Sequence, residues 1–187
     1  MVNAANPLEG VKVAFLVANE GVEQAELVKP WEAVIGAGGQ AVLVAPKNGM
    51  VQAFNHLDKG DTFPAERATS EISVDEFDGI VLPGGVANPD QLRMDGPAVA
   101  FVKQWFAEGK PAAVICHGPW TLVEAGVVRG RTLTSWPSLQ TDIRNAGGTW
   151  VDEACCTDGN LITSRKPDDL PEFCRALVEK FSSVKVS

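Results

Sequence analysis

The chain has 187 residues, of which 45% are hydrophobic and 21% are charged, and these values are ordinary for a globular protein with one sizeable core. Its formal net charge is −8, because 16 Lys and Arg residues stand against 24 Asp and Glu residues. An acidic protein repels phosphate backbones, so we expect no nucleic-acid partner. No apolar run approaches the roughly 20 residues that cross a bilayer, so we expect no membrane partner.

The first residues, MVNAANPLEG, have neither the basic region nor the apolar region of a signal peptide. We therefore expect a cytoplasmic protein whose thiols stay reduced. The four cysteines, at positions 116, 155, 156 and 174, lack the spacing of a zinc site or of a disulfide framework. No phosphate-binding glycine motif is present either, so we expect no metal and no cofactor.

The first half of the chain alternates short apolar segments with amphipathic ones. Residues 11–18 (VKVAFLVA) are almost entirely apolar and predict a strand buried on both faces. A helical pattern follows over residues 23–37, in which Pro30 predicts a kink or the true first turn. Residues 40–46 predict the next strand, and the polar segment 47–78 predicts a β-hairpin or a small excursion.

The second half repeats this alternation after a helix-capping signal at Ser73. The predicted elements are, in order, a strand at 79–82 ending at 83–85, a helix at 96–107, a strand at 111–115, a helix through Leu122 and Val123, a strand at 132–135, a helix at 138–146, a hairpin over 149–164 turning at 158–160, and a helix at 170–184. This order predicts one α/β domain over residues 1–187, with a doubly wound, mostly parallel sheet covered by helices on both faces.

The segment AAVICHGPWTLVEAG, residues 112–126, changes from a strand to a helix at Cys116 and His117. In a doubly wound sheet, ligands bind beyond the carboxyl ends of the strands, and a sharp strand-to-helix turn exposes its side chain there. The N–H groups of a helix start favour an anion, which predicts a lowered pKa for the thiol. A lone cysteine after an apolar run is more often an inert core residue. Gly118, Pro119 and the adjacent histidine together favour a nucleophile.

Three stretches of the chain carry a family resemblance: VAFLVANEGVEQAELVKP, FDGIVLPGGVANPDQLR, and VICHGPWTLVEAGVVRGRTLTSWPSLQTDIRNAGGTWVDE. On these stretches the chain resembles the ThiJ/PfpI superfamily, which has the flavodoxin-like, class I glutamine amidotransferase-like fold, and particularly its intracellular-protease and general-stress branch. The resemblance covers nearly the whole length. Its most specific part is ICHGP followed downstream by GR-LTS-P.

The resemblance implies that Cys116 is the nucleophile and that Glu26 is the acidic residue projecting toward the thiol from the first helix, with Glu23 as the alternative. Two ionised groups side by side would raise each other's pKa, so the pair helps only if Glu26 keeps its proton and hydrogen-bonds a thiolate. We therefore predict a raised pKa for Glu26 and a lowered pKa for Cys116.

The resemblance also implies an oxyanion hole formed by Gly85 and the backbone N–H of His117. The His117 side chain is either a base oriented by Asp90 of a neighbouring subunit or a histidine packed at an interface. Asp90 stands where some relatives have glutamate. Trp120 and Trp136 flank the predicted site and are candidates for its walls, as is Glu23.

The function that the resemblance implies is that of a cysteine-dependent stress-response hydrolase acting on peptides or on reactive-aldehyde (glyoxal-type) adducts, in a homodimer or a larger homo-oligomer. Its substrate would be a small molecule, a peptide or a protein. The alternatives are a redox sensor or holdase-type chaperone whose Cys116 is oxidised rather than turned over, and a non-catalytic interaction protein. Cys155, Cys156 and Cys174 are predicted to pack in the core, and His56 is predicted to have a surface role.

Overall fold

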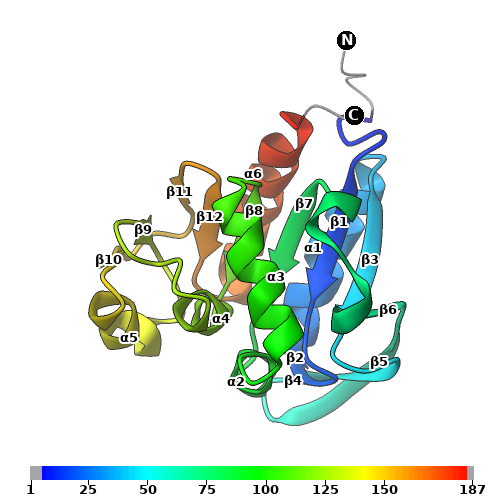
Figure 1. Cartoon of the computed structure of the whole chain (residues 1–187), viewed down its shortest axis with the longest axis horizontal. Coiled ribbons are helices and arrows are strands. Elements are labelled where there is room, and N and C mark those ends of the chain that lie inside the picture. Colours follow the sequence, from blue (N-terminus) through cyan, green and yellow to red (C-terminus); the bar gives the residue numbers. More distant parts are fainter. Residues whose placement is uncertain (1–5, 185–187) are drawn as a thin grey trace.

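The computed structural model describes residues 6–184, and its centre is a seven-stranded sheet in the order β11–β12–β8–β7–β1–β3–β6 (Figure 1). Neighbouring strands are parallel except for β11 and β12. The strands are β1 (Lys12–Leu16), β3 (Gln40–Ala45), β6 (Arg67–Ala68), β7 (Gly79–Leu82), β8 (Ala112–Ile115), β11 (Cys156–Asp158) and β12 (Leu161–Ser164). The predicted mostly parallel α/β fold is confirmed.

Helices cover both faces of this sheet, as the doubly wound prediction requires. One face packs against α1 and α6, and the other packs against α3, α4 and α5. The helices are α1 (Gln24–Gly36), α2 (Ala87–Leu92), α3 (Gly96–Ala107), α4 (Pro119–Glu124), α5 (Gln140–Asn145) and α6 (Leu170–Ser182), and the short 3₁₀ turns are η1 (Thr69–Glu71), η2 (Val74–Glu76), η3 (Pro137–Leu139) and η4 (Pro167–Asp169).

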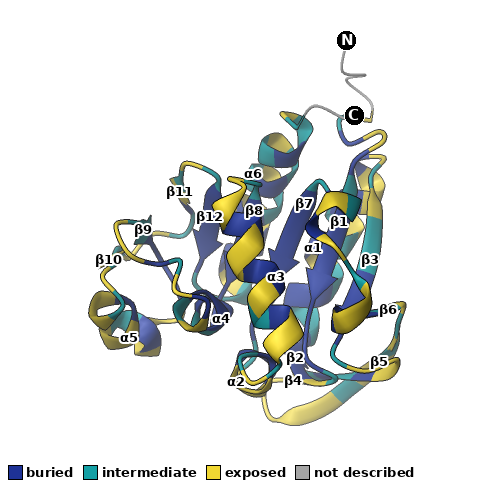
Figure 2. Ribbon diagram, in the orientation of Figure 1, coloured by how far each residue is buried: buried dark blue, intermediate teal, exposed yellow. Residues whose placement is uncertain are grey.

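The central strands are apolar on both sides because each side faces a separate hydrophobic cluster. In β1, Val13 and Phe15 pack toward α1 and α6, whereas Ala14 and Leu16 pack toward α3. Successive side chains of a strand point to opposite faces, so an unbroken apolar run is what a strand between two helical layers needs. Figure 2 shows these strands fully buried beneath helices whose outer faces are exposed.

The polar excursion after β3 folds into a second, three-stranded sheet. It contains β2 (Glu20–Glu23), β4 (Gly49–Asn55) and β5 (Asp58–Ala65), and the antiparallel β4–β5 pair is the predicted hairpin. Strand β2 was not predicted, because four residues that include a glycine give no strand period. It pairs in parallel with β4, and this pairing brings the hairpin to the end of β1.

Several sequence-based predictions were wrong in detail. Pro30 does not mark the first turn of α1, because the helix begins at Gln24 and runs to Gly36. The alternative, a kink at Pro30, stays a prediction. The segment at 132–135 is only partly a strand, β9 (Thr132–Leu133), and it pairs with β10 (Thr149–Trp150) outside the central sheet. Only β11 and β12 form the hairpin predicted for 149–164. The cap at Ser73 is present, since its N–H donates to Glu76 at 2.8 Å.

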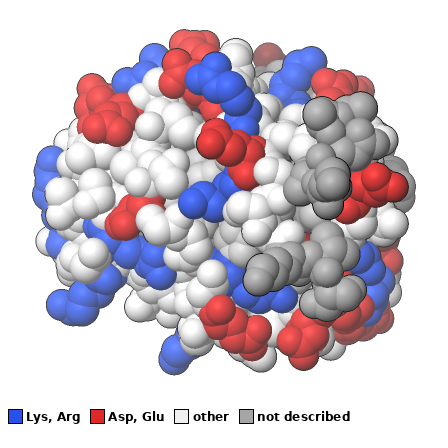
Figure 3. Space-filling model, turned by 90° about the horizontal axis from the view of Figure 1, so that it is seen from above, with Lys and Arg blue, Asp and Glu red and all other residues white. Residues whose placement is uncertain are grey.

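No helix within residues 6–184 is both long enough and apolar enough to cross a membrane. The end of the molecule seen from above in Figure 3 carries Lys and Arg interspersed with Asp and Glu side chains. Charges of both signs therefore share this face, and the net negative charge is not concentrated on it.

The contact between β7 and α6 gives a test of the packing. A methyl group at Gly79 would lie 2.8 Å from the ring of Phe181, which is fully buried. We expect Gly79→Ala to lower the free energy of unfolding by about 1–3 kcal/mol, because the ring must move within a close-packed core. Gly36→Ala is the matched control, since a methyl group there meets nothing within 4 Å. Urea unfolding that finds both variants equally stable would contradict this packing.

Candidate active site

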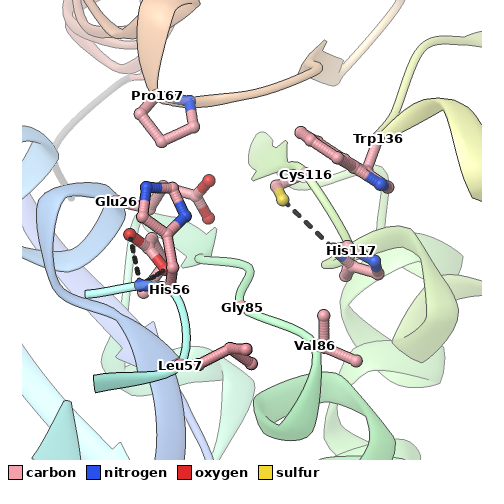
Figure 4. Close-up of a pocket in the computed structure, with 10 residues that line it drawn as sticks. Glu26, His56, Leu57, Gly85, Val86, Cys116, His117, Trp136 and Pro167 are labelled. Atoms are coloured by element: carbon pink, nitrogen blue, oxygen red, sulfur yellow. Dashed lines mark hydrogen bonds between the residues drawn. The ribbon is translucent and has the colours of Figure 1, made fainter. Parts of the chain in front are cut away.

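A cavity of about 240 Å³ lies where β1, β7 and β8 end, and it collects residues from distant parts of the chain (Figure 4). Parallel strands deliver their carboxyl-terminal loops to one edge of the sheet, which is why such sites form there. The lining residues are Glu23, Glu26, His56, Leu57, Gly85, Val86, Cys116, His117, Trp136 and Pro167.

Cys116 lies on a sharp turn between β8 and α4, with a φ of 62°. This left-handed conformation is uncommon for a residue other than glycine and marks a strained position. Backbone hydrogen bonds hold it: the Cys116 N–H donates to Ser164 at 3.0 Å, and the Trp136 N–H donates to the Cys116 carbonyl at 2.9 Å. Gly118 must be glycine, since a methyl group there would lie 2.7 Å from the carbonyl oxygen of Leu82.

The turn brings the Cys116 and His117 side chains together, although neighbours in sequence need not face each other. The Sγ of Cys116 lies 3.2 Å from Nδ1 of His117, and both residues are 6% exposed. Burial lowers the pKa of His117 to about 4, so the imidazole is neutral at physiological pH. It can accept a hydrogen bond from the thiol, but with this pKa it is a weak base.

The two tryptophans of the predicted walls have different positions. Trp136 lines the cavity and stacks on His117, with ring centroids 5.8 Å apart. Trp120 does not line the cavity: it packs edge-on behind His117 at 5.2 Å and donates its indole N–H to Asp142 at 2.9 Å. The prediction that Trp120 forms a wall is wrong, because α4 carries it away from the opening. Together the two rings fix the orientation of His117.

Glu26 projects from the first turn of α1 into the cavity and is completely buried, with 0% of its surface exposed. Its Oε2 accepts the N–H of Gly84 at 2.8 Å, whereas Oε1 has no partner of ordinary geometry among the described residues. Burial raises the pKa of Glu26 to about 8. Hydrogen bonds from the Cys116 thiol and the Gly84 N–H act to lower this pKa, and the charge of Glu23 acts to raise it. The predicted protonated carboxyl group is therefore the state at neutral pH.

The structure contradicts the lowered pKa predicted for Cys116. Burial raises the pKa of the thiol, the charge of Glu26 raises it further, and the N–H groups of Gly85 and His117 oppose both. The sequence pattern showed that Cys116 precedes a helix, which favours a thiolate, but it did not show that the thiol is buried. Once Glu26 holds its proton, the repulsion disappears and its O–H becomes a further donor for the sulfur. The carboxyl and the thiol therefore titrate as one pair.

The loop after β7 supplies one backbone N–H group to each member of this pair. The N–H of Gly84 donates to Glu26, and the N–H of Gly85 donates to the sulfur of Cys116. Gly84 lies between Glu26 and Cys116, since a methyl group there would be 2.5 Å from Oε2 of Glu26 and 2.6 Å from Cβ of Cys116. Asn88 holds the loop in place: its Nδ2 donates to the carbonyls of Pro83 and Gly84 at 3.0 Å, and its Oδ1 accepts the Ala18 N–H at 2.7 Å. Sequence analysis missed Asn88, because nothing in GVANP marks it.

The mouth of the cavity is formed by residues that sequence analysis also missed. His56, predicted to have only a surface role, lies at the turn of the β4–β5 hairpin with a φ of 59° and lines the cavity. Its backbone N–H donates to the Glu23 carboxylate at 3.1 Å. The apolar side chains of Leu57 and Val86 are 92% and 58% exposed beside it. Figure 4 shows Glu26 and His56 across the cavity from Cys116 and His117.

Asp90 is not part of this cavity. It lies on α2 with its side chain exposed, and within residues 6–184 it makes no hydrogen bond or ion pair with His117. A carboxylate supplied by a neighbouring subunit stays a prediction. Cys155, Cys156 and Cys174 are free thiols away from the cavity, and each contacts the hydrophobic core or lies within it. No cluster of metal-ligating side chains occurs in the described part of the chain.

A family model described as the DJ-1/PfpI family matches residues 11–180. The chain belongs to this family. It is 37% identical over 169 residues to the deglycase PfpI of Pyrococcus furiosus, covering 90% of this chain and 98% of that protein. It is 36% identical over 165 residues to the protein/nucleic acid deglycase 2 of Escherichia coli, covering 88% and 94% of the two chains.

Solved structures show the same fold. DJ-1beta of Drosophila melanogaster superposes with a TM-score of 0.83 at 26% identity, covering 92% of this chain and 90% of that one. A two-domain protein of Anabaena variabilis, which joins a DJ-1/ThiJ/PfpI-like domain to a ferritin-like domain, gives a TM-score of 0.86 at 34% identity. It covers 91% of this chain and 48% of the larger chain.

The raised pKa of Glu26 makes stability depend on pH. The pKa rises from 4.5 in an unfolded chain to about 8, so the folded protein binds more protons than the unfolded one between these values, and stability falls as pH rises through this window. We expect the stability of the wild-type protein relative to Glu26→Gln to decrease by on the order of 4 kcal/mol from the bottom to the top of the window. Urea unfolding at several pH values measures this difference, and a pH-independent one would contradict a buried neutral carboxyl group.

Proposed function

We propose that this protein is a cysteine-dependent deglycase, which hydrolyses the adducts that reactive, glyoxal-type aldehydes form with amines. The observation that carries the proposal is the placement of the Cys116 sulfur beside a carboxyl group that is protonated at neutral pH and before the N–H groups of Gly85 and His117. The names of the relatives support the class of reaction, since those of P. furiosus and E. coli are called deglycases.

Burial raises the pKa of the Cys116 thiol, so in the proposed reaction the thiol first loses its proton to solvent. The thiolate, with the protonated Glu26 as hydrogen-bond donor, then attacks the carbonyl carbon of the adduct. A C–S bond forms while the electron pair of the C=O bond moves to oxygen, where the N–H groups of Gly85 and His117 stabilise the charge. Glu26 donates its proton to this oxyanion. The amine then leaves as the neighbouring carbon becomes an aldehyde, and one water adds to that aldehyde. The hydrogen on this carbon shifts as hydride to the carbon that holds the sulfur, which expels the thiolate, and the acid product returns a proton to Glu26. The net reaction converts the adduct and water into a free amine and a hydroxy acid.

This site fits addition to a carbonyl better than cleavage of a peptide bond. A cysteine peptidase needs a base that takes the thiol proton and passes it to the leaving amine. His117 has a pKa of about 4 and no carboxylate partner within the described part of this chain, so it is poorly suited to that task. Peptide hydrolysis would require Asp90 of a neighbouring subunit to orient the imidazole.

We also propose that the protein self-associates and that it works in the cytoplasm. Asp90 lies on an exposed face of α2 and is available to a neighbouring copy. The mechanism needs Cys116 reduced, and thiols stay reduced in the cytoplasm.

Three variants test the chemistry. Cys116→Ser should abolish release of free amine from methylglyoxal-treated Nα-acetyl-lysine, because the hydroxyl is a far weaker nucleophile. Glu26→Gln keeps a donor toward the sulfur and should raise the apparent pKa of the thiol by no more than about one unit, whereas Glu26→Leu, which has no donor, should raise it by several units. The pH dependence of Cys116 alkylation measures both shifts.

The control for this test is Glu32→Gln, since Glu32 is exposed on α1 and does not line the cavity. A Cys116→Ser protein that released amine at the wild-type rate would overturn the proposed mechanism. Mass spectrometry after mild peroxide treatment distinguishes the alternative: a sulfinate at Cys116 in a protein without deglycase activity would favour redox sensing.

A further inference from the structure

Glu23 carries a negative charge into the cavity without a matching positive charge. It is the last residue of β2 and is 9% exposed. Both of its oxygens meet the same donor, the backbone N–H of His56, at 3.1 and 3.4 Å. An ionised carboxylate offers about four acceptor positions and normally fills them when buried. Within residues 6–184 it forms no ion pair.

The surroundings supply no cation for it. None of the described residues that line the cavity is Lys or Arg. Lys166 precedes the lining residue Pro167, but its ammonium group pairs with Asp168 at 3.6 Å. The neighbouring carboxyl group, Glu26, is neutral at physiological pH, and the charge of Glu23 is one of the causes that keep it so. The cavity therefore holds one neutral and one charged carboxyl group.

The rest of the mouth is apolar. Leu57 and Val86 present exposed aliphatic side chains beside the His56 turn, and the Trp136 ring is 38% exposed across from them. A lysine or arginine side chain has an aliphatic stem and a basic end, which suits an apolar rim above an anionic interior. A nucleobase adduct has neither an aliphatic stem nor a basic end. In a nucleic acid it is also attached to a phosphate backbone, which a protein of net charge −8 repels.

We propose that Glu23 binds the basic nitrogen of the substrate, so that the site selects aldehyde adducts of lysine and arginine side chains over adducts of thiols and nucleobases. This inference rests on the proposed deglycase function and names its substrate class. A charge-assisted hydrogen bond in a partly desolvated cavity is stronger than one between neutral groups. It would hold the nitrogen on the Glu23 side of the cavity and present the carbonyl carbon to Cys116 on the other.

The test compares Glu23→Gln with wild type on cationic and neutral substrates. The cationic ones are the methylglyoxal adducts of the amides of Nα-acetyl-lysine and Nα-acetyl-arginine, and the neutral ones are the hemithioacetal of N-acetylcysteine amide, the guanosine adduct and free methylglyoxal. Glutamine still accepts the His56 N–H, so the turn should stay in place. We expect kcat/KM to fall about 10- to 100-fold for the cationic adducts and less than twofold for the neutral substrates.

The matched control is Glu20→Gln, which removes the same charge from the exposed start of the same strand. It should leave every rate unchanged. An equal fall on all five substrates, or no fall on any, would overturn the role of Glu23 while leaving the deglycase proposal standing. A wild-type protein inactive on every substrate would instead refute the deglycase proposal itself.

Discussion

The site depends on one backbone constraint, the left-handed conformation of Cys116 between β8 and α4. An extended or right-handed residue at this point would turn the thiol away from Glu26 and separate it from the His117 ring. The conformation costs on the order of 1–3 kcal/mol for a residue with a Cβ atom. Hydrogen bonds from β12 and from the segment before η3, together with the space left by Gly118, hold it in place.

Neither of these supports is local in sequence. Ser164 ends β12, and Trp136 follows β9. Both of these segments must therefore pack against the Cys116 turn before its conformation is fixed. The fold thus stores strain at Cys116, the proposed nucleophile, and offsets it with contacts made elsewhere. This is the pattern expected where a side chain has to be presented to a ligand rather than packed.

The two carboxyl groups of the cavity have different surroundings. Glu26 lies deeper, is completely buried and has a pKa of about 8, whereas Glu23 lies at the mouth and is held by the N–H of His56. Different surroundings give neighbouring acids distinct roles. A proton donor and a fixed negative charge can thereby coexist within one small cavity.

The sequence predicts the parts of this arrangement that depend on local patterns. Apolar runs mark β1, β3, β7 and β8, because a strand between two helical layers must be apolar on both sides. The change of pattern at Cys116 marks the strand-to-helix turn, and the family resemblance supplies Glu26. In contrast, β2 and α2 are too short to show a period, and the pairing of β2 with β4 decides where His56 lies.

What the sequence could not give is the effect of tertiary packing on charge. His56 and Glu23 are 33 positions apart, and Asn88 and Ala18 are 70 positions apart, yet these pairs build the mouth and the floor of the cavity. The lowered pKa of Cys116 was predicted from the helix start and from a hydrogen bond with a protonated Glu26. The pKa is instead raised, and the largest cause is the burial of the thiol, which the sequence pattern did not show.

The protonation states of His117 and Glu26 favour addition to a carbonyl group over hydrolysis that begins with a general base. With a pKa of about 4, His117 has already lost its proton at neutral pH, and with a pKa of about 8, Glu26 still holds one. The sulfur therefore has a protonated carboxyl group and only a weakly basic imidazole beside it. An acid beside a nucleophile assists a reaction in which negative charge appears on a carbonyl oxygen, because the oxygen takes the proton as the C–S bond forms. Returning that proton to Glu26 as the product leaves restores the pair, so the same carboxyl group serves both halves of the cycle.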